Sequence, residues 1–250
     1  MKQILILIFL LAALPAGSFG QQRPAASEIL DRIDRNMVYD TARAEMEMII
    51  TVGGREIRKS FISFSRGNEK SYIEFLSPPR DMSTKILKIE DVVRVYYPSA
   101  ERVMRLSGHM LNQSMMGSDF SFEDMTERSR KLREEYTAEV KGEETAAGRP
   151  CYVLVMTSKI EKQTYFTRKS WIDRERFIGL KEELYARSGK LLKTMEVEGV
   201  ETIGRRSYPT KILLQDKLRE NSKTELVITK IQFDVAINDE MFTERQLMKK

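Results

Sequence analysis

The sequence has 250 residues, with 42 basic and 37 acidic side chains, a formal net charge of +5, one histidine and one cysteine. This length fits one large β domain or two small ones. Basic and acidic residues alternate along the chain, and no basic run is long enough to follow a phosphate backbone, so nucleic acid is not expected as a partner. The lone Cys151 cannot form an intramolecular disulfide and is expected to be buried, and one cysteine with one histidine cannot form the usual zinc site.

The first twenty residues have the pattern of a secretory signal peptide. Lys2 precedes an apolar run over residues 4–14, and small residues follow up to Gly20. The run is shorter than the roughly 20 residues that a membrane-spanning helix needs. We predict a cleaved signal peptide over residues 1–20, with a short uncleaved anchor as the alternative. No cysteine lies near the cleavage site, so no lipid anchor is expected on the mature chain, residues 21–250.

One helix is expected directly after the signal peptide. Apolar residues recur at helical spacing over residues 27–37, at Ile29, Leu30, Ile33 and Met37. Ser27 is expected to cap the free amides at the helix start.

From Arg43 onwards apolar side chains recur at every second position, which predicts β-strands. Gly53-Gly54 supplies the positive φ angles of a tight hairpin turn, and Pro78-Pro79 ends a strand because proline cannot donate to the ladder. The strand-like stretches are residues 43–52, 57–64, 72–76, 85–90, 92–97, 102–107, 136–142, 151–157, 170–173, 180–185, 191–198, 210–214 and 223–233. We expect roughly ten to twelve strands in an antiparallel sandwich or barrel.

The alternation stops between Gly108 and Arg130, where the chain is rich in methionine and phenylalanine. Long excursions from a sheet are usually lids, binding loops or disordered segments, and disordered segments lack large apolar side chains. Methionine is common where a surface must adapt to varied apolar ligands. A lid is therefore one interpretation of this segment, and gap-filling in an ordinary core is the other. Ser121 and Asp124 are expected to cap a short helix near Glu127.

Catalysis has little support in the sequence. Histidine is the usual base beside a catalytic nucleophile, but His109 has no G-x-S-x-G motif with it, which favours a loop or packing role. Asp119, Glu123 and Asp124 could bind a hard cation, but they lack the glycine-broken spacing of calcium loops, which favours a solvated turn or helix start. We predict no catalytic residue, no cofactor and no metal.

Neighbouring glutamates occur in pairs, such as Glu182-Glu183. Adjacent residues of a strand point to opposite faces, so such pairs do not place two carboxyl groups across one bond, as a glycosidase requires. We expect these pairs on solvated faces.

Three stretches resemble the outer-membrane lipoprotein-sorting (LolA-like) proteins. They are residues 116–124 (MGSDFSFED), residues 171–173 (WID), and residues 184–190 (LYARSGK). The resemblance extends over residues 27–242. It implies a mainly β fold, a half-open curved antiparallel barrel or sheet of roughly eleven strands with helices closing its hollow, and residues 21–250 forming a single LolA-like domain.

In well-studied members of this family the hollow receives the acyl chains of a lipoprotein, whereas more distant members are associated with exporters of the resistance-nodulation-division (RND) type. This sequence resembles the second group more closely. We predict a monomeric, non-enzymatic periplasmic carrier that binds lipid acyl chains or an acylated lipoprotein and moves it towards the outer membrane. The residues expected at the lid or hollow are Met110, Met115, Met116, Phe120, Phe122, Met125 and Trp171. The alternatives are a soluble partner of an inner-membrane RND-type exporter without lipid transfer, and an envelope-lipid hydrolase acting through His109.

Overall fold

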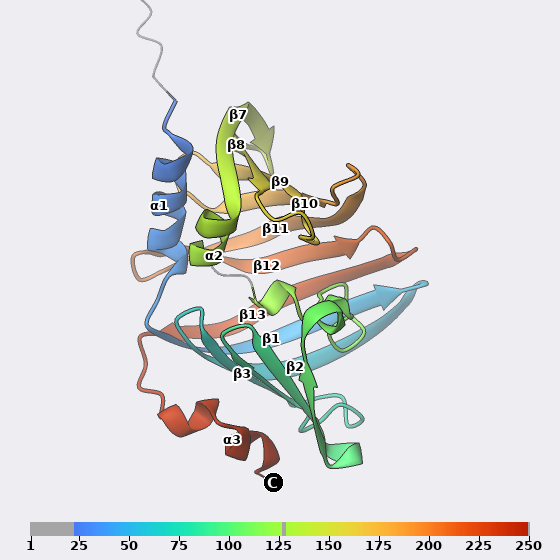
Figure 1. The fold of residues 1–250 in the computed structure, drawn as a ribbon. Helices are drawn as coiled ribbons and strands as arrows, with labels where there is room; N and C mark the ends of the chain where they lie inside the picture. The colour runs from blue at the N-terminus through green and yellow to red at the C-terminus, as the bar shows by residue number, and fades with distance from the viewer. Residues whose placement is uncertain (1–22, 127–128, 250) are drawn as a thin grey trace, which may run out of the picture.

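The computed structural model describes residues 23–126 and 129–249 (Figure 1). The predicted signal peptide and Glu127 lie outside the described residues. The described chain is mainly β, as predicted, and forms an open, curved antiparallel sheet with few helices. The sheet has 13 strands and not eleven. The strands stay separate because short turns divide them, as at Glu90-Asp91, where Glu90 has a φ of 53°.

The strands are β1 (Thr41–Val52), β2 (Arg55–Arg66), β3 (Lys70–Phe75), β4 (Lys85–Ile89), β5 (Val92–Tyr97), β6 (Arg102–Leu106), β7 (Tyr136–Ala146), β8 (Arg149–Ser158), β9 (Thr167–Asp173), β10 (Gly179–Tyr185), β11 (Leu191–Ile203), β12 (Arg206–Asp216) and β13 (Ser222–Phe233). The α-helices are α1 (Ala26–Met37), α2 (Ser129–Glu135) and α3 (Glu244–Met248). Four 3₁₀ turns complete the described chain: η1 (Pro98–Ala100), η2 (Gly108–Asn112), η3 (Asp124–Thr126) and η4 (Asp239–Phe242). None of the helices in the described residues is both long and apolar enough to span a bilayer.

The sheet consists of two meanders that join through their first and last strands. Strands β1 to β6 pair in chain order, β7 to β13 do the same, and β13 pairs with β1, so that β6 and β7 are the two edges. The predicted hairpin at Gly53-Gly54 is present, with φ angles of 57° and 78° that a side chain would disfavour. Every pairing is antiparallel, so each strand alternates between the two faces of one continuous sheet.

We call the face that carries Met48, Phe61 and Ile73 the inner face. These three side chains belong to one buried cluster, onto which the apolar residues of the segment 107–126 pack. We call residues 107–126 the cover segment; Figure 1 shows its green ribbon lying in front of the strands of the first meander. The outer face of β3 to β5 is covered instead by the C-terminal segment, where Phe242 and Leu247 are buried.

Helix α1 covers the inner face of the second meander, where its Ile29 is buried. The predicted cap at Ser27 is wrong, because the helix begins at Ala26 and has no side-chain cap. The C-terminal end of α1 is held instead by Arg206, whose guanidinium donates to the carbonyl oxygens of Arg35 (3.3 Å), Asn36 (3.3 Å) and Val38. A cation at this end also complements the helix dipole.

A candidate ligand-binding hollow on the inner face

Three cavities follow one another along the inner face, and neighbouring cavities share lining residues. We call them the central cavity (about 310 Å³), the helix cavity (about 270 Å³) and the polar cavity (about 250 Å³), and the three together the hollow. Single ligand sites usually measure about 300 to 1,000 Å³, so the cavities suit one elongated ligand better than three compact ones.

The central cavity lies between the cover segment and both meanders. The cover segment contributes Met115, Phe120 and Met125 to its wall. The sheet contributes Met46, Met48, Phe61, Ser63, Ile73, Leu184, Met195, Leu214 and Leu226. The wall is mostly apolar, and five of its side chains are methionines, which can adjust to ligands of different shape.

The helix cavity lies between α1 and the second meander. From α1 it is lined by Leu30, Ile33 and Met37, and from the sheet mainly by Leu154, Met156, Ile172, Leu180 and Val197. It shares Arg168, Glu182 and Met195 with the central cavity. These three residues therefore mark the boundary between the two apolar spaces.

At that boundary Arg168 and Glu182 form an ion pair. The guanidinium Nε and Nη2 of Arg168 donate to the two carboxylate oxygens of Glu182 at 3.0 and 3.1 Å, and Ser170 Oγ donates to Oε1 at 3.0 Å. The side chains are 4% and 12% exposed. A pair withdrawn from water in this way needs such bidentate geometry to offset its desolvation cost.

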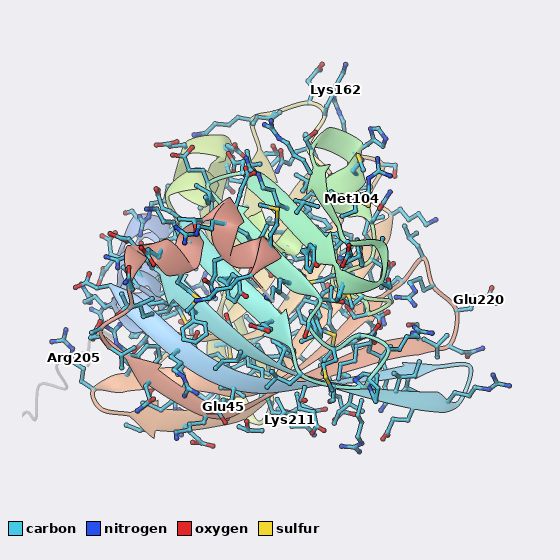
Figure 2. All side chains as sticks on the ribbon, turned by 90° about the horizontal axis from the view of Figure 1, so that it is seen from below. Glu45, Met104, Lys162, Arg205, Lys211 and Glu220 are labelled. Atoms are coloured by element: carbon cyan, nitrogen blue, oxygen red, sulfur yellow. The ribbon has the colours of Figure 1, made fainter. Side chains whose placement is uncertain are left out.

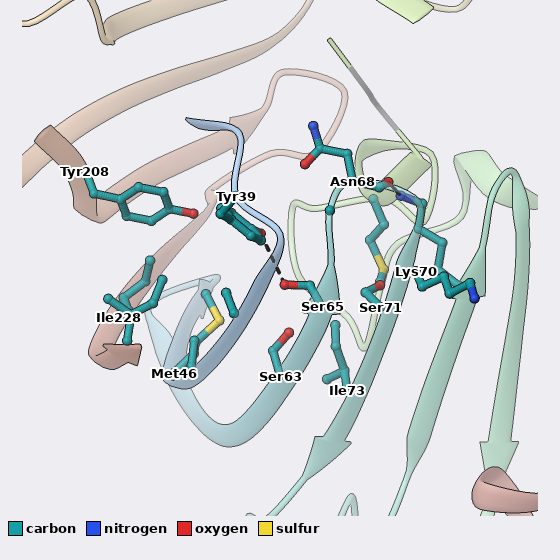
Figure 3. A pocket seen from close by; sticks show the side chains of 16 residues that line it. Tyr39, Met46, Ser63, Ser65, Asn68, Lys70, Ser71, Ile73, Tyr208 and Ile228 are labelled. Atoms are coloured by element: carbon teal, nitrogen blue, oxygen red, sulfur yellow. Dashed lines mark hydrogen bonds between the residues drawn. The ribbon is translucent and has the colours of Figure 1, made fainter. Parts of the chain in front are cut away.

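The polar cavity continues the hollow beyond the central cavity, with which it shares Met46, Ser63, Ile73 and Met125. Figure 3 shows its walls, with Tyr208 and Ile228 on one side and Asn68, Ser71 and Lys70 on the other. Hydroxyl and amide side chains contribute more of this wall than of the other two. The hollow thus changes from apolar to polar along its length.

The cover segment is a small hairpin whose conformation explains its sequence. Ser114 and Ser121 form a β-bridge, the amide of Met115 donates to the carbonyl of Phe120 at 2.7 Å, and the turn passes through Gly117 with a φ of 83°. A glycine is favoured there because this φ lies in the left-handed region.

Asp119 fastens this hairpin to the sheet. Its fully buried carboxylate accepts hydrogen bonds from Thr224 Oγ1 (2.6 Å), Ser222 Oγ (3.0 Å) and the amide of Asp216 (3.1 Å). Its own amide donates to Thr224 Oγ1 at 2.9 Å. Hydrogen bonds to an ionised acceptor are about twice as strong as neutral ones, so Asp119 is a strong attachment point.

Asp124 provides a second attachment. Its carboxylate accepts from Lys193 Nζ at 2.6 Å and from the Tyr165 hydroxyl at 2.7 Å. Ser121 and Asp124 also cap each other: the amide of Ser121 donates to Asp124 Oδ2 at 2.7 Å, and the amide of Asp124 donates to Ser121 Oγ at 3.4 Å. The short helix predicted near Glu127 extends outside the described residues. Two acidic residues therefore hold the cover segment over the central cavity.

The fold of the chain is that of several solved bacterial proteins. A DUF1329 family protein from Desulfovibrio piger has 26% identity and a TM-score of 0.82, with 89% of this chain and 97% of that chain covered. A putative outer membrane lipoprotein-sorting protein domain from Vibrio parahaemolyticus has 23% identity and a TM-score of 0.80, with the same coverage. A LolA superfamily protein from Nitrosomonas europaea has 24% identity and a TM-score of 0.74, with 90% and 100% covered.

Comparison with curated proteins gave no match. A family model described only as an uncharacterized protein matches residues 67–249, which is most of the chain. The chain belongs to the family of this model, and its fold is LolA-like. The match begins in the turn before β3 and includes the cover segment, both attachment points and most of the hollow.

The LolA-like fold brings three of the seven predicted site residues to the wall of the hollow. Met115, Phe120 and Met125 line the central cavity. Phe122 is 3% exposed and packs in the buried cluster beneath the cover segment. Met110 and Met116 are partly buried against the same cluster and line none of the three cavities.

Trp171 lies apart from the other six. Its neighbours Ser170 and Ile172 line the helix cavity, so the alternation of the strand directs Trp171 to the outer face. There its indole N–H donates to Glu144 at 2.7 Å, and the Lys169 and Lys181 ammonium groups lie 4.3 and 4.4 Å from the ring centroid. The structure does not bring Trp171 to the hollow.

The residues that the sequence suggested for catalysis or metal binding are exposed, buried or bound to other groups of the protein. His109 is exposed and lines none of the three cavities in the described structure. The carboxylates of Asp119 and Asp124 are held by protein donors, as described above. Cys151 is buried, as predicted, and burial raises the pKa of its thiol.

Sequence reasoning missed the polar residues inside the hollow. Glu182 was expected on a solvated face, and this is wrong because its carboxylate points inward to Arg168. Its neighbour Glu183 points to the other face, where it binds Lys181 at 2.8 Å. The signal that could have found Arg168 and Glu182 is the alternation of β9 and β10, since both share a face with apolar residues such as Ile172 and Leu184.

Proposed function

We propose that residues 21–250, after removal of the signal peptide, act in the periplasm as a carrier that binds lipid acyl chains or an acylated lipoprotein in the hollow. The observation that carries this proposal is the central cavity, which is apolar, lies beneath a fastened cover segment and continues into the helix cavity. Burial yields roughly 25 cal/mol for each Å² of apolar surface, so an acyl chain in such a space is held without a charged anchor. The likeness in fold to a lipoprotein-sorting domain supports the same function.

The proposal includes directed transfer towards the outer membrane without catalysis. A carrier must release its ligand, and a cover segment held by two polar attachments can open without disrupting the hydrogen bonds of the sheet. Among the described residues of the hollow, Arg168 is paired with Glu182 and Asp124 with Lys193, which favours structural roles for these charged groups. The alternative function, a soluble partner of an RND-type exporter, predicts a stable complex with the exporter and an empty hollow. An experiment that measures ligand binding in the hollow therefore separates the carrier from the exporter partner.

A substitution that fills the hollow tests the proposal. Met195 lines both the central and the helix cavities, so Met195→Trp should lower the affinity for a neutral fluorescent apolar probe, N-phenyl-1-naphthylamine, by at least about tenfold. Met104→Trp is the matched control, because Met104 is 39% exposed on the edge strand β6 and lines none of the three cavities.

The measurement is probe fluorescence on the two variants, after circular dichroism has shown that both are folded. Displacement of the probe by a diacylated lipopeptide then reports on the ligand itself. Equal probe and lipopeptide binding by Met195→Trp and by the unaltered chain would contradict the proposal.

A further inference from the structure

The exposed apolar side chains gather at one end of the sheet. In an antiparallel meander the turns after alternate strands lie at the same end, so the turns that follow β1, β3, β5, β8, β10 and β12 share one end, which we call the tip end. Nine large apolar side chains are exposed among the described residues, and none of them lies in a turn of the opposite end. Single exposed apolar residues need no explanation, whereas a grouping at one end indicates a contact surface. Six of the nine lie in the tip-end turns or within a few residues of them: Val52, Ile57, Leu76, Met82, Ile160 and Leu218.

The two ends of the sheet also differ in charge. The tip-end turns (residues 53–54, 76–84, 98–101, 159–166, 186–190 and 217–221) carry seven basic and four acidic side chains, a charge of +3. The turns of the opposite end (67–69, 90–91, 147–148, 174–178 and 204–205) carry three basic and four acidic side chains, a charge of −1. A surface that combines exposed apolar side chains with excess positive charge is complementary to an anionic phospholipid membrane.

Two turns of the tip end are joined to each other. The amide of Gly53, between β1 and β2, donates to the carbonyl of Asn221, between β12 and β13, at 3.0 Å. Figure 1 shows these two turns projecting side by side at the right of the sheet, and Figure 2 shows them together again, with Glu220 labelled in the second turn. Leu218, in the same turn, is 57% exposed, so a large apolar side chain lies at the surface of this projection.

An apolar row of β1 leads from the hollow to the tip end. Met46 and Met48 line the central cavity, and Ile50 and Val52 follow them at alternate positions, so all four lie on the inner face. Ile57 pairs with Ile50 in the register of β1 and β2 and therefore shares this face. Ile50 is buried in the cluster under the cover segment, whereas Val52 and Ile57 are exposed. The apolar inner face thus continues beyond its cover to the tip end.

The cover segment is attached to the same turn that carries Leu218. The guanidinium of Arg219 donates to the carbonyl of Gly117 at 3.0 Å and to the carbonyl of Ser118, both in the hairpin of the cover segment. Asp119 of that hairpin is held by β12 and β13 on the two sides of the turn. A contact made at this turn therefore lies directly beside the attachment of the cover segment.

We propose that the tip end docks on the surface of an anionic phospholipid membrane, with Leu218, Val52 and Ile57 as its apolar contacts and the basic turns against the headgroups. The docking does not depend on the proposed carrier function, because it uses a surface outside the hollow. For a carrier, this placement brings the apolar row of β1 and the attachment of the cover segment to the membrane. A hydrophobic ligand then enters and leaves the hollow at the membrane surface.

Sedimentation of the mature protein with lipid vesicles measures the docking. At low salt, vesicles of phosphatidylglycerol and phosphatidylcholine in equal parts should bind the protein at least about tenfold more tightly than vesicles of phosphatidylcholine alone. The difference should shrink as salt is raised, because screening weakens the attraction between exposed charges. This comparison needs no substitution. Equal binding to the two kinds of vesicle at low salt, or binding to neither, would overturn the docking surface.

An apolar double variant tests the contacts themselves, after circular dichroism has shown that it is folded. Ile57→Ser/Leu218→Ser should lower the affinity for the anionic vesicles by about tenfold, because it removes two apolar contacts. The matched control Met104→Ser/Met248→Ser removes side chains that are 39% and 57% exposed outside the tip end, and should change the affinity by less than about twofold. Equal affinities of the two double variants would contradict the assignment of the contacts.

A charge variant tests the basic turns. Arg55→Gln/Lys217→Gln removes two positive charges from the joined turns and should lower the affinity for the anionic vesicles by about tenfold, with little effect on phosphatidylcholine vesicles. The control Lys141→Gln/Lys230→Gln removes the same charge from exposed positions on β7 and β13, away from the tip-end turns, and should keep the affinity. An equal loss in both variants would show that only the net charge of the molecule matters and would overturn a local docking surface.

Binding in the hollow is measured separately. Ile57→Ser/Leu218→Ser should bind N-phenyl-1-naphthylamine as the unaltered chain does, since neither side chain lines the three cavities in the described structure. Loss of vesicle binding with intact probe binding is thus distinct from failure of the carrier function. A dimer in analytical ultracentrifugation that Ile57→Ser/Leu218→Ser abolishes, without vesicle binding by the unaltered chain, would assign the tip end to a second copy of the chain and overturn this inference.

Discussion

At the scale of single residues, two aspartates have clear structural roles in two of the three stretches on which the family resemblance rests. Asp119 of the MGSDFSFED stretch joins the cover segment to β13, and Asp173 of the Trp171-Ile172-Asp173 stretch shapes the turn after β9. The role of Asp119 cannot be predicted from the sequence, since its partners lie about a hundred positions further along the chain. The sequence does show an aspartate at each turn. Aspartate is common at turns because its side chain accepts hydrogen bonds from nearby backbone amides.

Asp119→Asn tests the attachment of the cover segment. The amide is nearly isosteric but cannot accept hydrogen bonds at both terminal atoms, so either Ser222 and Thr224 or the Asp216 amide lose their acceptor. We expect a loss of about 2 kcal/mol in the free energy of unfolding, measured by urea denaturation. Asp239→Asn, at a side chain that is 74% exposed, should change it by less than about 0.5 kcal/mol. Equal stability of the two variants would show that Asp119 is not an attachment point.

Asp173 makes the stability of the chain depend on pH in a defined direction. Burial raises the pKa of Asp173, but hydrogen bonds from Arg149 and from the amides of Arg176 and Glu175 lower it more, so the pKa lies below its ordinary value. The unfolded chain then binds the proton more readily than the folded chain. The stabilisation is complete above the ordinary pKa of about 3.9 and is lost as pH falls through the lower pKa of the folded state.

Asp173→Asn should therefore cost about 2 kcal/mol in the free energy of unfolding at pH 7 and clearly less near pH 2. Urea denaturation at the two pH values measures the difference. Glu175→Gln is the control: Glu175 contacts the same Arg149 at 2.7 Å but is 76% exposed, so its loss should matter little. A penalty for Asp173→Asn that stays constant with pH would contradict the assignment.

At the scale of elements, the strands were predictable and the cover segment was only partly so. Alternation located every strand to within a few residues, because each strand has one face against apolar side chains. The cover segment was recognised by the loss of that alternation, but which of its apolar residues face the hollow depends on a hairpin closed by Met115 and Phe120. No periodic pattern of apolar residues in the sequence predicts that hairpin.

Two phenylalanines of the cover segment, Phe120 and Phe122, are expected to respond differently to substitution by alanine. Phe122 is buried in the cluster between the cover segment and the sheet, so Phe122→Ala should cost about 3 to 5 kcal/mol in the free energy of unfolding. Phe120 lines the central cavity and is only partly buried, so Phe120→Ala should cost less and should weaken binding of the apolar probe. Urea denaturation and probe titration of both variants provide the comparison. A larger stability loss for Phe120→Ala than for Phe122→Ala would reverse these roles.

At the scale of the whole molecule, the open sheet and its covers define the hollow. Figure 2 shows the molecule from below, with the strands of the sheet around the side chains that fill its interior. The family resemblance predicted an open sheet with a hollow, but the wall of the hollow combines α1, the cover segment and strands from both meanders. Residues as distant as Met46, Phe120 and Met195 meet there only after folding, so their shared site could not be derived from local pattern. The change from apolar to polar lining along the hollow depends on the same assembly.

The most direct test of the carrier function is native mass spectrometry of the mature protein, purified gently from the periplasm, with lipid extraction from the same sample. We predict an added mass at defined stoichiometry that corresponds to a lipid or an acylated peptide, and its loss in Met195→Trp but not in Met104→Trp. A mass equal to that of the bare chain, unchanged after addition of phospholipid or a model lipopeptide, would contradict the carrier function.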